Sequence, residues 1–428
     1  MARKLASIVE IESCEPIPDT ERLSVATMKW KGWKVVTGRD EFKPGDLCVY
    51  FEIDAALDPT DDRYSFLRER CLRKFVSKGG NVLREVIRIK TCKLRGVVSQ
   101  GLLMPIGKFP ELNQLLNEKY PAGEGAVREF RMSENGVVSE IHLLDAVPDV
   151  NGKRRLFVIE RARILDWPNP EHPHPPSHLE GLVGEDVTEL LHVEHYDEVK
   201  EQLQPAMGNP ISADAMGKFP TAFCPKTDEP RLQGLTEYFD TMKGKFFEVT
   251  EKRDGASISF GYCPMIDAEN PFMVCSRNLR LKSEKADGTV PMMWQTVRAL
   301  GLDWKCVIAP NLMFQAEFCG MGVNGNADRL NEYTIEVFRV YDVEKQEFVE
   351  AMERRVLCCV MDIPHVPVIA PALDVFNRFH NIDEILPYAD GKTVRGNPRE
   401  GLVFKEVGTT HPISFKVVSN KYLLKQKD

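Results

Sequence analysis

Residues 251–255, with the sequence EKRDG, place Lys252 among acidic residues and shortly before a glycine. A lysine amine becomes a nucleophile when it loses its proton, so a lysine in a suitable site can form a covalent intermediate. For this stretch alone, a surface lysine beside a turn is the simpler interpretation. The surrounding segment KFFEVTEKRDGASISFGY alternates apolar and polar residues, which predicts two short strands joined as a hairpin at Asp254 and Gly255.

Further residues with chemical potential follow Lys252 in order, each on or beside a predicted strand. They are Arg277 and Asn278 in SRN, Glu317 in FQAEFCG, Tyr341 in FRVYD, Glu400 and Lys405 in EGLVFK, and Lys416 in SFKVVSNKY. This series resembles the motifs of the covalent nucleotidyltransferases, the superfamily of ATP-dependent DNA and RNA ligases and mRNA capping enzymes. One such motif is weak evidence, but the ordered series at plausible spacing is strong evidence.

The resemblance implies that Lys252 attacks the α-phosphorus of ATP and becomes lysyl-AMP. The AMP would then pass to a 5′-phosphate end, and a 3′-hydroxyl would displace it to form a phosphodiester. Because the attacking amine must be deprotonated, we expect the pKa of Lys252 to be lowered by Lys405, Lys416 and a bound divalent cation, Mg²⁺ or Mn²⁺.

The resemblance also assigns the remaining site residues. Arg277 would hold a phosphate by bidentate hydrogen bonds, Glu317 would accept from the ribose hydroxyls, and Glu400 would bind the metal through its waters. The residues implied in nucleotide binding are Glu251, Asp254, Gly255, Arg277, Asn278, Glu317 and Tyr341.

The resemblance leaves two roles to be assigned, the aromatic that stacks on adenine and the second lysine of the last motif. Phe338 and Tyr341 lie three residues apart on a predicted strand and would face opposite sides. The family places its adenine-stacking aromatic directly before the aspartate, which selects Tyr341 and leaves Phe338 to the core. The family also usually ends with the spacing Lys-x-Lys, whereas here Val418 stands at the second position. Either Lys421 or Lys405 would supply the second charge, or this chain handles pyrophosphate differently.

The N-terminal part of the chain, up to about residue 105, reads as short alternating strands separated by Gly and Pro breakers, which predicts a small OB-type β-barrel. Three aromatic residues there, Trp30, Trp33 and Tyr50, could stack on bases, although most aromatics at strand spacing belong to a core. A basic stretch would contact the nucleic-acid backbone beside the break. Its members are Arg84, Arg88, Lys90, Lys93 and Arg95.

Residues 108–185 read as irregular, and they end in the proline-rich segment WPNPEHPHPPSHLEG, which we interpret as a linker or exposed loop. Its histidines, His172, His174 and His178, lack acidic or cysteine partners at ligand spacing, so metal binding is disfavoured. We therefore expect an OB-like domain over residues 1–200 with an insertion at about 108–185. A nucleotidyltransferase domain with antiparallel sheets would follow over 201–428, in an α+β fold class.

The order of the domains distinguishes among the nucleotidyltransferases. DNA ligases and capping enzymes carry an OB domain after the catalytic motifs, but here only 428 − 416 = 12 residues follow Lys416. A barrel before the nucleophile resembles the RNA ligases of the Deinococcus and Naegleria type. The expected activity is ATP-dependent joining of RNA ends, including nicks in RNA-containing duplexes. A DNA ligase, a capping-type enzyme and a noncatalytic OB-fold nucleic-acid-binding protein are the alternatives.

Composition sets the cellular context. The net charge of −8 argues against a nonspecific nucleic-acid coat, and no apolar run approaches the roughly 18 residues of a membrane span. The 11 cysteines are scattered and never spaced Cys-x-x-Cys, which is typical of a reducing compartment. We expect a cytoplasmic monomer that does not enter the membrane.

Overall fold

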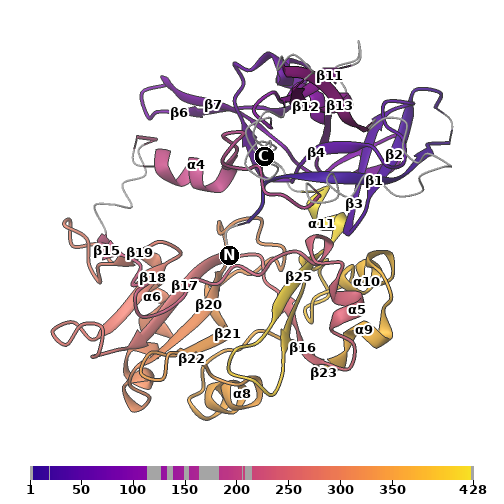
Figure 1. The fold of residues 1–428 in the computed structure, drawn as a ribbon. Coiled ribbons are helices and arrows are strands. Elements are labelled where there is room, and N and C mark those ends of the chain that lie inside the picture. The colour runs from indigo at the N-terminus through magenta and orange to yellow at the C-terminus, as the bar shows by residue number, and fades with distance from the viewer. Residues whose placement is uncertain are drawn as a thin grey trace. The chain divides into compact units, whose positions relative to one another are not determined.

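The protein was analysed as a computed structural model that describes residues 3–18, 20–112, 127–132, 138–148, 154–162, 183–204, 206–207 and 215–425. Two compact units make up the chain, Met1–Gly208 and Asn209–Asp428 (Figure 1). Among the helices of the described residues, none is both long and apolar enough to cross a membrane.

The N-terminal unit is built from short antiparallel strands. One sheet has the order β10-β4-β1-β2-β3, formed by β10 (Leu102–Pro105), β4 (Leu47–Phe51), β1 (Ala6–Pro16), β2 (Leu23–Met28) and β3 (Lys31–Gly38). A second has the order β14-β5-β7-β6, formed by β14 (Glu194–His195), β5 (Ala55–Leu57), β7 (Val82–Arg88) and β6 (Leu72–Val76). Besides these two sheets, this unit contains the paired strands β8 (Cys92–Leu94) and β9 (Val97–Ser99), the helices α1 (Arg68–Cys71) and α4 (Tyr196–Leu203), and the 3-10 turns Asp62–Leu67 and Ile106–Lys108.

The three aromatic residues considered for base stacking, Trp30, Trp33 and Tyr50, differ in burial. The side chains of Trp33 and Tyr50 are each only 1% exposed and belong to one core cluster with Val9 and Ile11. The Tyr50 hydroxyl also donates a hydrogen bond to the Gln100 carbonyl at 3.0 Å. Neither ring can therefore stack on a base, whereas Trp30 is 67% exposed.

Part of the segment predicted to be irregular is regular. Strands β11 (Val127–Met132), β12 (Val138–Pro148) and β13 (Arg154–Ala162) form an antiparallel sheet with β12 at its centre. The prediction is wrong for these strands because they are rich in Val, Ile, Leu and Phe and precede the proline cluster that begins at Pro168. The proline-rich segment and His172, His174 and His178 lie outside the described residues.

Two antiparallel sheets form the C-terminal unit. The larger has the order β15-β19-β18-β17-β20-β21-β22, formed by β15 (Ala215–Lys218), β19 (Leu279–Leu281), β18 (Phe272–Ser276), β17 (Ala256–Tyr262), β20 (Leu312–Cys319), β21 (Thr334–Asp342) and β22 (Glu347–Phe348). The smaller has the order β23-β16-β24-β25, formed by β23 (Val368–Asp374), β16 (Phe246–Lys252), β24 (Gly401–Glu406) and β25 (Ser414–Val418).

Helices cover one face of each sheet. The larger sheet shares a hydrophobic core with α6 (Met292–Ala299), α7 (Leu302–Lys305) and α8 (Ala351–Val360). The smaller shares its core with α5 (Tyr238–Thr241), α9 (Val375–Arg378) and α10 (Ile382–Ala389), which lie beside it in Figure 1. A last helix, α11 (Asn420–Leu423), follows β25, and 3-10 turns occupy Leu232–Gly234 and Cys306–Ile308.

Alternation along the strands leaves a polar face on each sheet. In β16, β24 and β25 the residues Phe247, Val249, Phe404 and Phe415 point into the core, so their neighbours Lys252, Lys405 and Lys416 belong to the opposite face. In the larger sheet Phe314, Ala316 and Phe318 are core residues, which places Gln315 and Glu317 on the polar face.

Candidate active site

The segment EKRDG connects the two sheets. Strand β16 pairs with β23 and β24, whereas β17 pairs with β18 and β20, so the predicted hairpin between them is wrong. The prediction identified both strands but not their partners, because alternation does not specify which sheet a strand joins. Gly255 makes the crossing possible, since a Cβ atom there would lie 2.4 Å from the Phe318 carbonyl oxygen and 2.7 Å from Glu317 Cγ.

Lys252 ends β16 in contact with a carboxylate. Its Nζ lies 2.6 Å from Oε1 of Glu400, and its side chain is 24% exposed. Burial lowers the pKa of the Lys252 amine, but the carboxylates of Glu400 and Glu317 raise it, and the net shift is upward. In the protein without nucleotide or metal, Lys252 is therefore held as a cation, and a lowered pKa in the presence of a divalent cation stays a prediction.

Carboxylates crowd around this amine. Burial raises the pKa of Glu317 to about 7, Lys252 opposes that shift, and the nearby Glu400, Asp254 and Glu229 add to it. Asp254 also holds the backbone of a neighbouring loop, because its Oδ2 accepts a hydrogen bond from Ala327 N at 3.0 Å. The cluster carries more negative charge than Lys252 alone balances.

Glu251 lies in a separate, buried ion network. Its Oε2 accepts from Arg253 Nη1 at 3.1 Å, and its Oε1 accepts from Val394 N at 2.9 Å. Arg253, only 5% exposed, also pairs with Asp328 and, at 2.8 Å, with Glu336. Since these contacts occupy the carboxylate, a nucleotide contact from Glu251 would have to come from its backbone.

Lys405 and Lys416 supply positive charge on the same sheet face. Burial lowers the pKa of Lys405 to about 7, Glu229 opposes the shift, and Arg354 and Arg339 add to it. Burial likewise lowers the pKa of Lys416, whose Nζ lies 2.9 Å from Asp228, while the charge of Lys252 acts in the same downward direction. The effect of Lys252 on the pKa of Lys416 indicates that the two amines lie close together.

The position of the missing second lysine is hydrophobic. Val418 is 2% exposed and ends β25, so it contributes no charge. Lys421 is 76% exposed and pairs with Asp390 at 3.4 Å. Lys405, in contrast, shares Glu229 with Lys416, because both lysines lower the pKa of that carboxyl. Of the two candidates, the geometry favours Lys405 as the second cation.

Sequence reasoning gave no role to residues 228–231, which the structure brings to the site. Backbone N of Lys416 donates to the Pro230 carbonyl at 2.8 Å, and the charge of Arg231 acts on both Lys252 and Lys416. Glu229 faces Arg339 at 3.7 Å. The bridge between Arg231 and Lys416 of β25 shows that this segment lines the site.

Arg277 and Asn278 lie at the same edge. Nη2 of Arg277 is 3.4 Å from Asp228, and the arginine side chain is 51% exposed, so its guanidinium is accessible to a phosphate. Oδ1 of Asn278 accepts a hydrogen bond from Lys226. The structure therefore brings together the cations of residues 226–231, the SRN motif and β25.

The two candidate aromatics, Phe338 and Tyr341, have different surroundings. Tyr341 is 9% exposed and packs in a cluster with Met313 and Cys275, with its ring 5.1 Å from that of Phe348. Phe338 lies at a β-bulge, because Gln315 pairs with Arg339 and Ala316 with Val337, and Lys405 Nζ is 5.3 Å from its ring centroid. The assignment of Phe338 to the core is wrong, since a bulge interrupts strand alternation.

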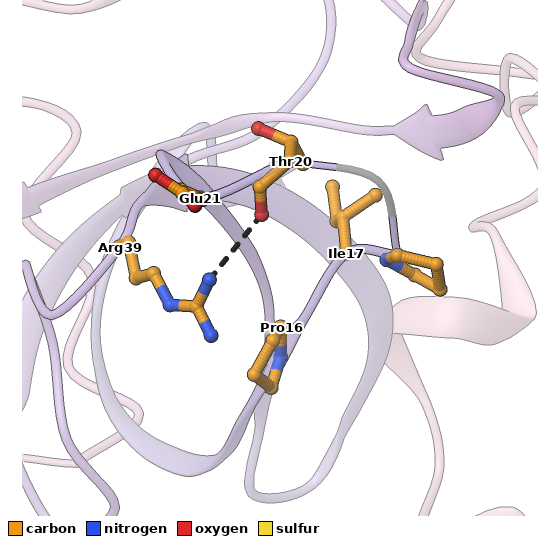
Figure 2. Close-up of a pocket in the computed structure, with 6 residues that line it drawn as sticks. Pro16, Ile17, Thr20, Glu21 and Arg39 are labelled. Atoms are coloured by element: carbon orange, nitrogen blue, oxygen red, sulfur yellow. Dashed lines mark hydrogen bonds between the residues drawn. The ribbon is translucent and has the colours of Figure 1, made fainter.

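A hollow beside Lys252 joins the motif residues. Its lining includes Lys252, Asp254, Glu400, Cys319, Asp328 and Thr393. A second hollow lies in the N-terminal unit between Pro16, Thr20 and Arg39, where Arg39 Nη1 donates to the Thr20 carbonyl at 3.3 Å (Figure 2). None of the predicted site residues lines it.

The basic stretch of the N-terminal unit divides into paired and exposed residues. Arg84 pairs with Glu194, and Arg88 pairs with Asp54 at 3.0 Å and lies 4.2 Å from the Tyr196 ring centroid. Lys90 is half-buried, whereas Lys93 and Arg95 are exposed in and after β8. Contacts to a nucleic-acid backbone are therefore best offered by Lys93 and Arg95.

The carboxylates fit a divalent cation. The upward pKa shift of Glu317 shows that burial and negative neighbours disfavour its charge, a condition that a hard cation relieves. Among the described residues, no three His, Cys, Asp or Glu side chains gather as a complete ligand set. Glu400 and Glu317 would therefore hold the cation together with water and substrate oxygens, as Mg²⁺ and Mn²⁺ sites commonly do.

Comparison with known proteins agrees with this geometry. An OB-fold domain family matches residues 5–106, and the RNA ligase family matches residues 245–423. The chain superposes on the Naegleria gruberi RNA ligase with PPi at a TM-score of 0.70 and 28% identity, covering 100% of both chains. A mutant of that ligase with AMP and Mn gives the same values, and one with ATP and Mn gives a TM-score of 0.69 at 28% identity, covering 100% of this chain and 98% of that one. No curated protein matched the chain by sequence.

The fold and the site thus define a nucleotidyltransferase in which an OB-fold domain precedes the ligase domain. The chain is an RNA ligase that resembles the Naegleria enzyme over its full length. The predicted fold class is confirmed, and the predicted ATP and divalent cation agree with the ligands of the similar structures.

Proposed function

We propose that the protein joins RNA 3′-hydroxyl and 5′-phosphate ends with ATP as the AMP donor and Lys252 as the covalent carrier. The observation that carries this proposal is the position of Lys252 at the junction of two polar sheet faces, 2.6 Å from Glu400. Lys416 and Arg231 add positive charge beside it. The ATP, AMP, Mn and PPi of the similar structures support the same substrate and metal.

In the first step the amine of Lys252 forms a bond to the α-phosphorus while the bond to the pyrophosphate oxygen breaks, and the amine releases its proton. Glu400 and Glu317 hold the amine protonated in the free protein, so their charge must be compensated before attack. These carboxylates would hold a divalent cation, which would supply that compensation and neutralise the phosphate oxygens. Lys416, Arg231 and Lys405 are placed to stabilise the leaving pyrophosphate.

In the later steps the AMP moves to the RNA. The 5′-phosphate oxygen attacks the phosphorus of lysyl-AMP and frees Lys252, and the 3′-hydroxyl then attacks the 5′-phosphate and expels AMP. Arg277, whose guanidinium is half-exposed at the edge of the site, would hold the phosphate during these transfers. Lys93 and Arg95 would contact the strand beside the break through its backbone.

The test is covalent labelling with ATP that carries the label on its α-phosphate. Protein freed of AMP by pyrophosphate is incubated with label and Mg²⁺ or Mn²⁺ and then separated under denaturing conditions. Wild type should retain label, and Lys252→Ala should retain none, because among the described residues no other lysine amine has these surroundings. Label on Lys252→Ala equal to that on wild type would refute the assignment.

A matched control lies at the other end of the same strand. Lys245 directly precedes β16 and pairs with Glu406 at 2.7 Å, so it is also a lysine held by a carboxylate. Lys245→Ala should label like wild type. Sealing assays with RNA or DNA on each side of a nick then decide the substrate, with RNA at the 3′-hydroxyl side as the expected preference.

We also infer an intracellular monomer. All 11 cysteines are free, as expected for a reducing compartment. Light scattering of the purified chain measures the mass directly, and a value near 48.6 kDa is expected.

A further inference from the structure

We propose that Trp30 stacks on an unpaired base of the RNA substrate, an inference that rests on the proposed RNA-joining function. The residue lies in the N-terminal unit, in the turn between β2 and β3, where Met28 pairs with Lys31. Its side chain is 67% exposed. Water-exposed tryptophan is uncommon enough to call for an explanation when its backbone is also strained.

The backbone of Trp30 is in the left-handed region. Its φ is +56°, a conformation that favours Gly, Asn or Asp and disfavours a bulky side chain. A folding requirement would select glycine here, because glycine takes this conformation without a steric penalty. A tryptophan that is both strained and solvent-facing contributes no core packing, so its retention is better explained by a ligand.

The charge around the turn fits a polynucleotide. Residues 28–35 contain Lys29, Lys31 and Lys34 and no acidic residue. Lys29 pairs with the buried Glu10 of β1, which anchors the start of the turn, and Glu12 and Glu15 are the exposed acids on the same strand. An aromatic face between lysines is the arrangement that binds single-stranded nucleic acid, through base stacking and phosphate attraction.

A second tryptophan of equal exposure shows a different environment. Trp304 is also 67% exposed, but it lies in helix α7 and its ring packs over Gly301, where a Cβ would be 2.4 Å from the indole Nε1. The adjacent Lys305 is paired with Asp362 at 2.9 Å. Trp304 therefore has a structural explanation and serves as the matched control for Trp30.

The experiment measures binding of the full-length chain to a labelled single-stranded RNA and to a fully paired RNA duplex. We expect Trp30→Ala to weaken single-strand binding about 10-fold or more, with a smaller effect on the duplex. Trp30→Phe should restore most of the affinity, and Trp304→Ala should bind within about 2-fold of wild type. If Trp30→Ala binds single-stranded RNA as tightly as wild type does, the proposal is overturned. A protein partner would then explain the exposed ring.

A further variant separates binding from folding. Trp30→Gly should unfold at a higher temperature than wild type because it relieves the strained backbone, yet it should lose the same affinity for RNA. If Trp30 had only a structural role, its replacement by glycine would not raise the unfolding temperature and at the same time weaken RNA binding. Failure of wild type to bind single-stranded RNA would also overturn the proposal.

Labelling of Lys252 in the same preparations distinguishes the two hypotheses. The α-phosphate label does not require RNA, so Trp30→Ala should be labelled like wild type. If wild type is labelled and seals RNA while Trp30→Ala binds and seals equally well, only the role of Trp30 fails. If wild type is not labelled, the ligase function itself fails.

Discussion

Lys252 and Lys405 lie on the same polar face of one sheet, yet their surroundings shift their pKa values in opposite directions. Burial lowers the pKa of both amines. Around Lys252 the carboxylates of Glu400 and Glu317 outweigh burial, whereas around Lys405 the cations Arg354 and Arg339 reinforce it. At Lys252 the carboxylates therefore outweigh burial, whereas at Lys405 burial outweighs the opposing carboxylate of Glu229.

The comparison explains how the site can remain inactive without its substrates. The proposed nucleophile is held charged by the same carboxylates that would hold the divalent cation, so we expect attack to depend on that cation being bound. Lys405 needs no such partner, since its amine lies 3.0 Å from the Phe338 carbonyl and is fixed within the fold. We therefore expect a ligand to control the charge of Lys252, whereas Lys405 forms part of the site wall.

The largest effect is expected from removing the carboxylate at Lys252. Glu400→Gln should reduce labelling by about 100-fold or more, because it removes a metal ligand. In metal-free protein the same change should lower the pKa of Lys252, which pH-dependent acetylation followed by mass spectrometry measures. Glu406→Gln, which alters the carboxylate paired with Lys245, is the control and should change neither quantity. An unchanged pKa of Lys252 in Glu400→Gln would contradict the comparison.

Lys405→Met should change how stability depends on pH. The pKa of Lys405 is about 7 in the folded protein and about 10.4 in an unfolded chain, so between these values the unfolded chain binds more protons. The free energy of unfolding of wild type should therefore rise with pH from 7 to 10, by a few kcal/mol from this group.

Urea unfolding of wild type and Lys405→Met across that pH range gives the difference between their free energies of unfolding. Cysteine ionisation contributes equally to both proteins and cancels in this difference. The stability of the methionine variant relative to wild type should fall as the pH rises, because the variant lacks this contribution. Lys421→Met removes an exposed lysine and should show a constant difference. A constant difference for Lys405→Met as well would mean that Lys405 stays charged in the fold.

The smallest effect concerns the adenine-stacking aromatic. Phe338→Leu should raise the KM for ATP roughly 3- to 10-fold if its ring, beside Lys405, stacks on the base. Tyr341→Leu should chiefly lower the free energy of unfolding, because that ring is buried in a hydrophobic cluster. A larger rise in KM for Tyr341→Leu, with Tyr341→Phe unaffected, would favour the family-based assignment instead.

Local patterns were sufficient to predict much of the fold. The apolar spacing of PMMWQTVRAL and AMERRVLCCVMD is helical, and these segments contain the helices α6 and α8. The motif segments NLMFQAEFCG, YTIEVFRVYDV and EGLVFKEV contain the predicted strands β20, β21 and β24. These elements have strong periodicity and bury one face, so propensity and packing agree. The strands β11 to β13 were missed because the proline cluster after them dominated the interpretation of the whole segment.

The chemical types in the ligase half and their order could be read from the amino-acid sequence: the predicted nucleophile Lys252, its carboxylates and its cations. Which of them meet depends on the tertiary structure. It placed β16 and β17 in different sheets, brought Asp228 and Arg231 to β25, and turned Phe338 toward Lys405 at a bulge. The reason is that residue type specifies what a side chain can do, whereas strand partners, bulges and pKa shifts depend on neighbours that are distant along the chain.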